Sequence, residues 1–498
     1  MTEPATEKFD LIVAGGGPGG AALATFVAMQ GHRVLLLEKE SFPRYQIGES
    51  LLPSTVHSMC RLLDVYEEIK NAGFWLKPGA TFRWGKNPSL WNFRFKLPQT
   101  PEGLGYSFQV ERSRFDSILL ENAMRKGVDV RMRHTCTSVI KEGERTVGVS
   151  FRDENGQERS ACARFIADAS GNTTRISRAV GDRVYSDFFR NIAVFGYYEN
   201  AKRLPPPDQG NSLHVAFKDG WFWYIPLSST LTSVGAVVAR GAVDAFSDGP
   251  EAAYNTFIEA CPIIKDYVST GRRICEGSYG EIRVRKDYSY ANTRFWTPGM
   301  VLIGDAACFV DPIFSSGVHL ATYSALLAAR SVNSCLEARL PEARCFEEFE
   351  RRYRREFNHF YQFNIAFYDM NKDQDSYYWH ARTVLNTKER ANDAFVTLVS
   401  GSAAEQFFDQ RIGIGDVLQK HSEGAKDPIK GANFDTSKLD LIKVADGLAE
   451  GRFSVDRLAR LRPAAEEKPL FEGGLICSAS GLHWDAAAAM AQPRTDRV

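Results

Sequence analysis

The first residues of this chain that could form a binding site are glycines and a carboxylate at a fixed spacing. Gly15, Gly17 and Gly20 follow a short apolar run, and Glu38 stands at the end of the next apolar run. A Gly-x-Gly-x-x-Gly turn lets the backbone approach a pyrophosphate, and an acidic residue about 20 positions further on accepts hydrogen bonds from ribose hydroxyls. This spacing predicts a dinucleotide-binding site.

Alternating strands and helices must position these side chains. Residues 9–14 and 33–37 are typical of strands buried on both faces, and the small residues of 21–30 favour a helix between them. Two more acidic residues follow predicted strands: Asp168 in Asp-Ala-Ser-Gly, and Asp305 in Gly-Asp-Ala-Ala. These distant strands indicate that the dinucleotide domain is discontinuous.

Composition and charge argue against several other classes of protein. The 498 residues include 61 Lys and Arg against 61 Asp and Glu, and this zero net charge is unlike that of a nucleic-acid-binding protein. The nine cysteines contain no Cys-x-x-Cys pair, so neither a disulfide framework nor a metal site is expected. No apolar run approaches about 18 residues. We therefore expect a cytoplasmic protein that binds neither nucleic acid nor membrane.

The three glycine and acid clusters resemble the FAD-binding pattern of the aromatic-hydroxylase superfamily, over about residues 8–335. Two further segments narrow this resemblance. Residues 221–226, Trp-Phe-Trp-Tyr-Ile-Pro, match the WxWxIP motif of flavin-dependent halogenases, and residues 309–320 look like their halide-binding segment. The segment Gly48-Glu49-Ser50 also agrees with the sequence pattern of these halogenases. The chain thus resembles a flavin-dependent halogenase of the phenol and pyrrole branch.

The resemblance and the residue pattern together predict an α/β fold with separate regions. A Rossmann-like FAD-binding domain of the aromatic-hydroxylase type is expected over residues 1–187 and 291–337. Apolar and polar residues alternate over 188–290, as in an antiparallel sheet with one solvated face, and we expect an inserted substrate domain there. Residues 338–498 are expected to form a mainly helical C-terminal region.

The resemblance also implies where the cofactor and the halide bind. Chloride, or bromide in its place, would lie near Ser316 and Gly317, because the free amides at a helix start favour an anion. The cofactor would be FAD, in its reduced form FADH2. The residues implied to hold it are Gly15, Gly17, Gly20, Glu38, Glu49, Arg112, Asp168, Gly304, Asp305, Pro312 and Val318.

A lysine remote from the flavin is implied to receive hypohalous acid through a tunnel. Lys77 is the best match, and Lys86, nine positions on, is the competing lysine. Burial near aromatic residues would lower the pKa of such a lysine. The residues implied to separate the flavin from the organic substrate are Trp221, Trp223, Ile225 and Pro226.

One difference from the tryptophan halogenases narrows the class of possible substrates. Those enzymes resemble this chain in the halide segment but carry a glutamate where Phe314 stands here. Without that carboxylate, a phenol or pyrrole is favoured over tryptophan, because such rings are already electron-rich. The aromatic stretches 367–371 and 376–382 also look like the phenolic branch.

The function implied is that of an FADH2-dependent halogenase. It would use O2 and chloride to form hypochlorous acid and chlorinate a phenolic precursor of a secondary metabolite such as an antibiotic, free or tethered to a carrier protein. Its partner would be a separate flavin reductase. The alternatives are an FAD- and NADPH-dependent aromatic monooxygenase, a prenyl-lipid-saturating flavin reductase and a non-catalytic flavoprotein.

Overall fold

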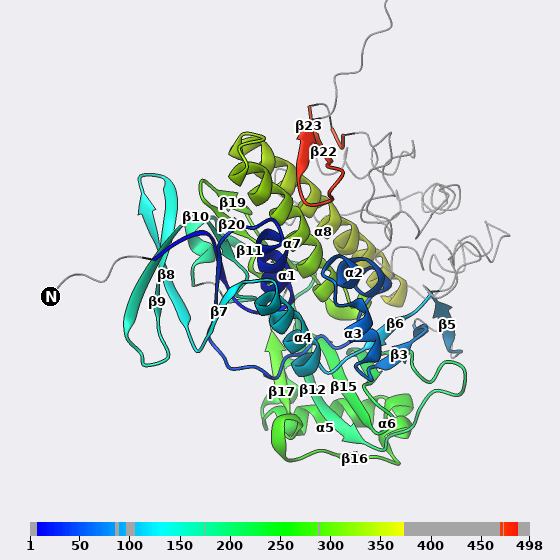
Figure 1. The fold of residues 1–498 in the computed structure, drawn as a ribbon. Coiled ribbons are helices and arrows are strands. Elements are labelled where there is room, and N and C mark those ends of the chain that lie inside the picture. Colours follow the sequence, from blue (N-terminus) through cyan, green and yellow to red (C-terminus); the bar gives the residue numbers. More distant parts are fainter. Residues whose placement is uncertain are drawn as a thin grey trace, which may run out of the picture.

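The computed structural model describes residues 7–84, 89–95, 105–173, 175–286, 289–372, 469–471 and 473–486 (Figure 1). Lys86 and the stretch 376–382 lie outside these ranges. None of the helices within them combines the length and the apolarity that crossing a membrane requires.

A mainly parallel sheet forms one half of the molecule, with the strand order β19-β20-β10-β1-β2-β7. β9 lies antiparallel to β10 and β8 antiparallel to β9. Leu11, Ile12 and Val13 of β1 have no exposed surface, as their apolar run predicts for a strand covered on both faces. The strands are β1 (Glu7–Ala14), β2 (Val34–Glu38), β7 (Asp129–Met132), β8 (Thr135–Glu142), β9 (Arg145–Arg152), β10 (Glu158–Asp168), β19 (Trp296–Thr297) and β20 (Met300–Leu302).

Helices distant in sequence pack together beside this sheet. α1 packs against α4 and α7, and α7 packs against α8 (Figure 1). α1 begins with a proline directly after the glycine turn, where a missing amide hydrogen costs nothing. The helices are α1 (Pro18–Ala28), α2 (Cys60–Leu62), α3 (Tyr66–Asn71), α4 (Arg112–Arg125), α7 (Gly317–Leu336) and α8 (Glu342–Lys372).

A second sheet has the order β16-β12-β15-β14-β13-β4-β5, with β17 also paired to β12. β4 and β5 come from the first hundred residues, and β4 runs parallel to β13 while the other neighbours are antiparallel. The strands are β4 (Gly79–Arg83), β5 (Trp91–Arg94), β12 (Asn191–Glu199), β13 (Ser212–Phe217), β14 (Gly220–Pro226), β15 (Leu231–Ala239), β16 (Arg272–Arg273) and β17 (Arg283–Lys286).

The two faces of this second sheet have different partners. Phe222 and Tyr224 pack with residues of α5 (Pro250–Ala260) and α6 (Pro262–Val268) on one face. Trp221 and Trp223, on the same strand, pack with aromatic residues on the other face, including Phe314. Because successive side chains of a strand alternate in direction, the tryptophan motif presents both indoles to one face.

Smaller sheets complete the described structure. They are β3 (Trp75–Lys77) with β6 (Ser107–Gln109), the sheet β11 (Arg183–Tyr185), β18 (Tyr290–Asn292) and β21 (Cys308–Phe309), and the hairpin β22 (Leu475–Cys477) with β23 (Trp484–Ala486). The hairpin, red in Figure 1, contacts α7. There the fully buried Trp484 donates its indole hydrogen to Ser331 Oγ at 3.0 Å, which fixes the hairpin to the helix.

Candidate active site

A cavity of about 930 Å³ lies where the carboxyl ends of the parallel strands meet the second sheet. Most of the residues predicted for the site line it. They are Gly15, Gly17, Glu38, Glu49, Arg112, Trp221, Trp223, Ile225, Gly304, Asp305, Pro312, Gly317 and Val318. Of the described residues predicted for the site, those outside the lining are Gly20, Lys77, Asp168, Pro226 and Ser316.

The glycine turn is built for close backbone contact. Gly15 has a φ of +111°, and a Cβ there would lie 2.4 Å from the Ala169 carbonyl oxygen. A Cβ on Gly20 would lie 1.9 Å from the Gly15 carbonyl oxygen, so α1 rests directly on the turn. Gly17 caps α1 without a side chain over the first amides. The turn therefore leaves helix-start amides open to a pyrophosphate.

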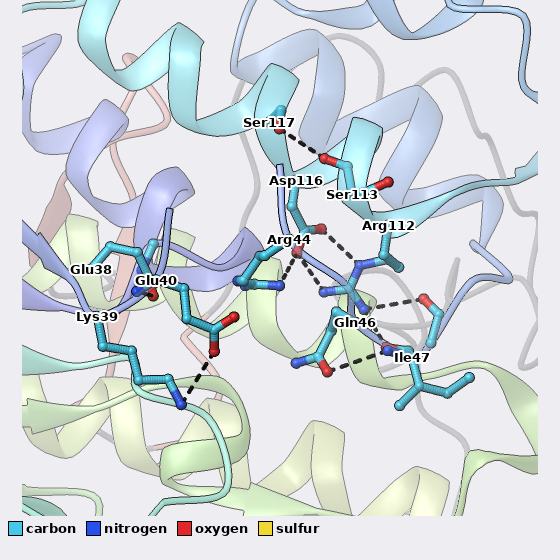
Figure 2. Close-up of polar contacts among 12 residues, drawn as sticks. Glu38, Lys39, Glu40, Arg44, Gln46, Ile47, Arg112, Ser113, Asp116 and Ser117 are labelled. Carbon is cyan, nitrogen blue, oxygen red and sulfur yellow. Dashed lines mark hydrogen bonds and ion pairs between the residues drawn. The ribbon is translucent and has the colours of Figure 1, made fainter. Parts of the chain in front are cut away.

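Carboxylates stand beside this turn. Glu38 accepts a hydrogen bond from the Gly16 amide at 2.6 Å. It accepts a second one from the Glu40 amide at 2.8 Å (Figure 2). Each of its oxygens keeps a lone pair for a ribose hydroxyl. Asp168 accepts from the Ser170 amide at 2.9 Å, and burial raises its pKa to about 6. Asp168 therefore shapes the turn after β10 from behind the cavity lining.

Arg112 fixes a segment that lines the cavity. Its guanidinium donates to both oxygens of Asp116, at 2.7 and 2.9 Å, and to the Ile47 carbonyl oxygen at 2.7 Å (Figure 2). Arg44 adds an ion pair to Asp116 at 3.2 Å. Sequence reasoning missed Asp116, although its spacing from Arg112, one helical turn along α4, was a usable signal.

Glu49 carries a buried acceptor at the cavity wall. Its Oε1 accepts from Tyr197 Oη at 2.8 Å, whereas its Oε2 has no hydrogen-bond partner in the described parts of the chain. Burial raises the pKa of Glu49 to about 7, and the Tyr197 hydrogen bond opposes this shift. A glycine cradle together with an unsatisfied acceptor fits FAD, which presents phosphates, hydroxyls and ring N–H groups.

The predicted halide segment turns sharply into α7. Ser315 has a φ of 57°, and Ser316 then caps the helix with its hydroxyl buried and unbonded within the described structure. A Cβ on Gly317 would lie 3.0 Å from the Phe309 ring, so a side chain would close this part of the cavity. The free amides and dipole of this long helix are suited to an anion.

A buried histidine anchors the first turn of α7. His319 bonds Ser54 Oγ through Nδ1 at 3.0 Å and Glu356 Oε1 of α8 through Nε2 at 2.8 Å. Burial alone would raise the pKa of Glu356, but hydrogen bonds with His319 and His359 lower it to about 2. The carboxylate is therefore ionised. The sequence placed His319 in the halide segment but did not reveal these partners.

The indoles of β14 are held at their polar ends. Trp223 donates to Ser233 Oγ at 3.2 Å and lies so close to the sheet that a Cβ on Gly235 would come within 2.2 Å of its ring. Trp221 donates to the hydroxyl of Tyr368, which donates to Asp311 Oδ2 at 2.7 Å. The two rings thus form a fixed wall on one side of the cavity.

Lys77 is the last residue of β3 and lies outside the cavity lining. Only 1% of its side chain is exposed, and Nζ donates to the Leu51 carbonyl oxygen at 3.0 Å. The Phe95 ring centroid lies 5.2 Å from Nζ. Burial lowers the pKa of Lys77 to about 7. The neutral amine, which is the form that reacts with an electrophile, is therefore accessible near neutral pH.

Phe314 lies in an aromatic cluster. Its ring centroid is 4.8 Å from that of Phe363, 5.0 Å from that of Phe367 and 6.3 Å from that of Phe82. Only 2% of Phe314 is exposed. The position at which the resemblance to the tryptophan halogenases implies a glutamate is therefore surrounded by apolar side chains.

Comparison with known proteins agrees with this geometry. The family model for tryptophan halogenases matches residues 10–102 and 94–413. A tryptophan 2-halogenase of Chondromyces crocatus is 33% identical over 413 residues, covering 80% of this chain and 77% of its own. The flavin-dependent halogenase armH4 of Armillaria mellea is 32% identical over 421 residues, covering 79% and 78%.

A solved structure extends the likeness to the fold. The myxobacterial chondrochloren halogenase CndH, described as a variant of FAD-dependent halogenases, is 55% identical with a TM-score of 0.75, covering 96% of this chain and all of its own. This likeness confirms the predicted α/β FAD-binding fold and FAD as the cofactor, and it favours halogenation over hydroxylation. The chain belongs to the tryptophan halogenase family and is a flavin-dependent halogenase.

Proposed function

We infer that this halogenase chlorinates a phenolic precursor of a secondary metabolite, either free or tethered to a carrier protein. The observation that carries this inference is the apolar surrounding of Phe314, whose ring packs against Phe363 and Phe367. At this position a ring that needs a carboxylate to accept its proton meets a phenylalanine instead. A phenol needs less help, because its hydroxyl raises the electron density of the ring itself.

The net reaction balances with one reduced cofactor per halogen. FADH2, supplied by a separate flavin reductase, provides the two electrons for FADH2 + O2 + Cl⁻ + H⁺ + ArH → FAD + ArCl + 2 H2O. The glycine turn at Gly15 and Gly17 binds the pyrophosphate of the cofactor, Glu38 binds its ribose, and the segment fixed by Arg112 covers it. These residues bind and orient the flavin, and they exclude water from it.

The start of α7 holds the chloride beside the flavin. Gly317 lines the cavity, so the helix start offers its first amides to the ion, whereas the buried hydroxyl of Ser316, which is unbonded among the described residues, lies behind the lining. The contacts of His319 with Ser54 and Glu356 keep this turn in place. A halide held here would lie in the same cavity as the flavin, which would supply the oxidising chemistry when bound.

Lys77 carries the halogen to the substrate. Its neutral amine reacts with hypochlorous acid in R-NH2 + HOCl → R-NHCl + H2O, and the chloramine then chlorinates the ring in R-NHCl + ArH → R-NH2 + ArCl. The pKa of about 7 makes the neutral amine available. Trp221 and Trp223 keep the phenol away from the flavin, so direct oxygen transfer does not compete.

The test is product analysis over a small panel. The purified enzyme, a flavin reductase, NADH, FAD and O2 are incubated with phenols, pyrroles and tryptophan, with chloride, bromide or no halide. One arm presents a phenol as a thioester on a carrier protein. We expect a chlorine isotope pattern on a phenol and none on tryptophan. Preferential chlorination of tryptophan would refute the proposed substrate, and a halide-independent gain of oxygen would refute the separation of substrate from flavin.

A further inference from the structure

His214 is a buried residue that the mechanism above does not use. It lies on β13, with 2% of its side chain exposed, opposite Phe82 of β4 on one side and Trp223 of β14 on the other. Its ring stacks on Phe82 at 4.7 Å and lies 5.6 Å from the Trp221 ring. It also lines the flavin cavity together with both tryptophans. His214 is therefore part of the wall.

One nitrogen of this histidine is bonded and the other is not. Nε2 lies 3.0 Å from Ser212 Oγ, whereas the buried Nδ1 has no hydrogen-bond partner among the described residues. Burial and the nearby charge of Lys77 lower the pKa of His214 to about 3, so the imidazole is neutral. We assign the ring hydrogen to Nε2, where it is donated to Ser212. Nδ1 is then a free acceptor, which is unusual in a protein interior.

The same histidine lines the cavity and lies within the electrostatic reach of Lys77. Of the described residues His214 and Lys77, only His214 lines the cavity. The charge of Lys77 nevertheless disfavours protonation of the His214 imidazole. Further buried polar atoms without partners in the described ranges belong to Ser107, which pairs with Lys77 across the β3–β6 ladder, and to Gln109 on the same strand. The surroundings of Lys77 therefore hold buried polar atoms that have no hydrogen-bond partner in the described ranges, whereas the cavity is lined by the two indoles.

We propose that His214 binds hypohalous acid on its way from the flavin cavity to Lys77, with Nδ1 accepting the hydrogen bond of the acid's hydroxyl group. This inference rests on the proposed role of Lys77. No bond to His214 forms or breaks, because the imidazole only exchanges a hydrogen bond. Held by its hydroxyl, the acid keeps its halogen free for the amine. Because the ring is neutral, it does not hold a halide ion at this place.

The test compares two substitutions that differ in one acceptor. His214→Asn keeps a polar acceptor near the position of Nδ1, whereas His214→Phe fills the space without one. Each variant is run with reductase, O2, chloride and a phenol in the presence of taurine, which captures hypochlorous acid that escapes. We expect His214→Phe to raise the ratio of taurine chloramine to chlorinated phenol about tenfold, as expected for one lost hydrogen bond. His214→Asn should stay near the wild-type ratio.

A second readout needs no turnover. Nitrogen NMR of labelled imidazoles in the FAD-loaded protein, assigned by comparison with His214→Asn, should show a neutral His214 ring with its hydrogen on Nε2 between pH 5 and 8. A hydrogen on Nδ1, or an unchanged taurine ratio in His214→Phe, overturns the inference. If the wild type forms no chlorinated phenol, or Lys77→Ala forms as much as the wild type, the proposed function fails instead. Measured FAD affinity and melting temperature show whether the variants are folded.

Discussion

Replacing Lys77 by methionine should make the protein more stable while it abolishes chlorination. Burial moves the pKa of Lys77 from its ordinary value of 10.5 to about 7. At about 1.4 kcal/mol per pKa unit, this shift destabilises the folded state by about 4 kcal/mol at pH 7. The hydrogen bond to Leu51 offsets about 1 kcal/mol of that cost. The free energy of unfolding of Lys77→Met should therefore be about 3 kcal/mol higher than that of the wild type at pH 7.

The pH dependence identifies the cause of this gain. Between pH 7 and about 10.5 the unfolded chain binds a proton at Lys77 that the folded chain does not, so wild-type stability rises with pH in this window. By pH 10 the cost of burial falls to about 1 kcal/mol, and the advantage of Lys77→Met should vanish. Urea titrations of the FAD-loaded proteins at both pH values measure this difference.

The matched control is Lys70, an exposed lysine of α3 whose side chain is 50% accessible. Lys70→Met removes the same charge without relieving a buried one, so it should show little change at either pH. An advantage of Lys77→Met that is absent at pH 7, or equal at pH 7 and pH 10, would refute the reasoning that burial depresses the pKa of this amine.

Three more substitutions test the surrounding structure. Gly235→Ala places a Cβ within 2.2 Å of the Trp223 ring, so we expect several-fold less chlorinated product per FADH2 consumed; an unchanged yield would contradict a fixed wall. His319→Gln removes the Nδ1 contact at the start of α7 and should raise the KM for chloride about tenfold at unchanged kcat. An equal rise in the KM for the phenol would argue against a halide-specific role. Asp116→Asn weakens the ion pair that holds the guanidinium of Arg112 in place. It should raise the dissociation constant of FAD about tenfold, as measured by fluorescence titration.

Local patterns in the sequence predicted the parts of the site that depend on neighbouring residues. The glycine turn at Gly15 and the acid at Glu38 follow from strand and helix spacing alone. The alternation of strand side chains placed both indoles of residues 221–226 on one face, and the structure has them there. The roles of these residues in catalysis stay predictions until they are tested.

Contacts between distant segments were beyond the reach of these patterns. Gly235 lies under Trp223 because β15 pairs with β14 in one particular register, which no local spacing reveals. The parallel pairing of β4 with β13 likewise joins residues far apart in sequence and brings Phe82 onto His214. A histidine in a strand gives no sign of which nitrogen will lack a partner, so His214 could be found only in three dimensions.

The most direct test of the account is the fate of the oxidant in Lys77→Ala. The variant is incubated with flavin reductase, O2, chloride, a phenol that the wild type chlorinates, and taurine. If Lys77 transfers the halogen and the flavin site works independently of it, taurine chloramine should form at the wild-type rate of FADH2 consumption while chlorinated phenol is lost. Chlorination of the phenol at the wild-type level, or oxygen incorporated into the phenol in place of chlorine, would contradict the account.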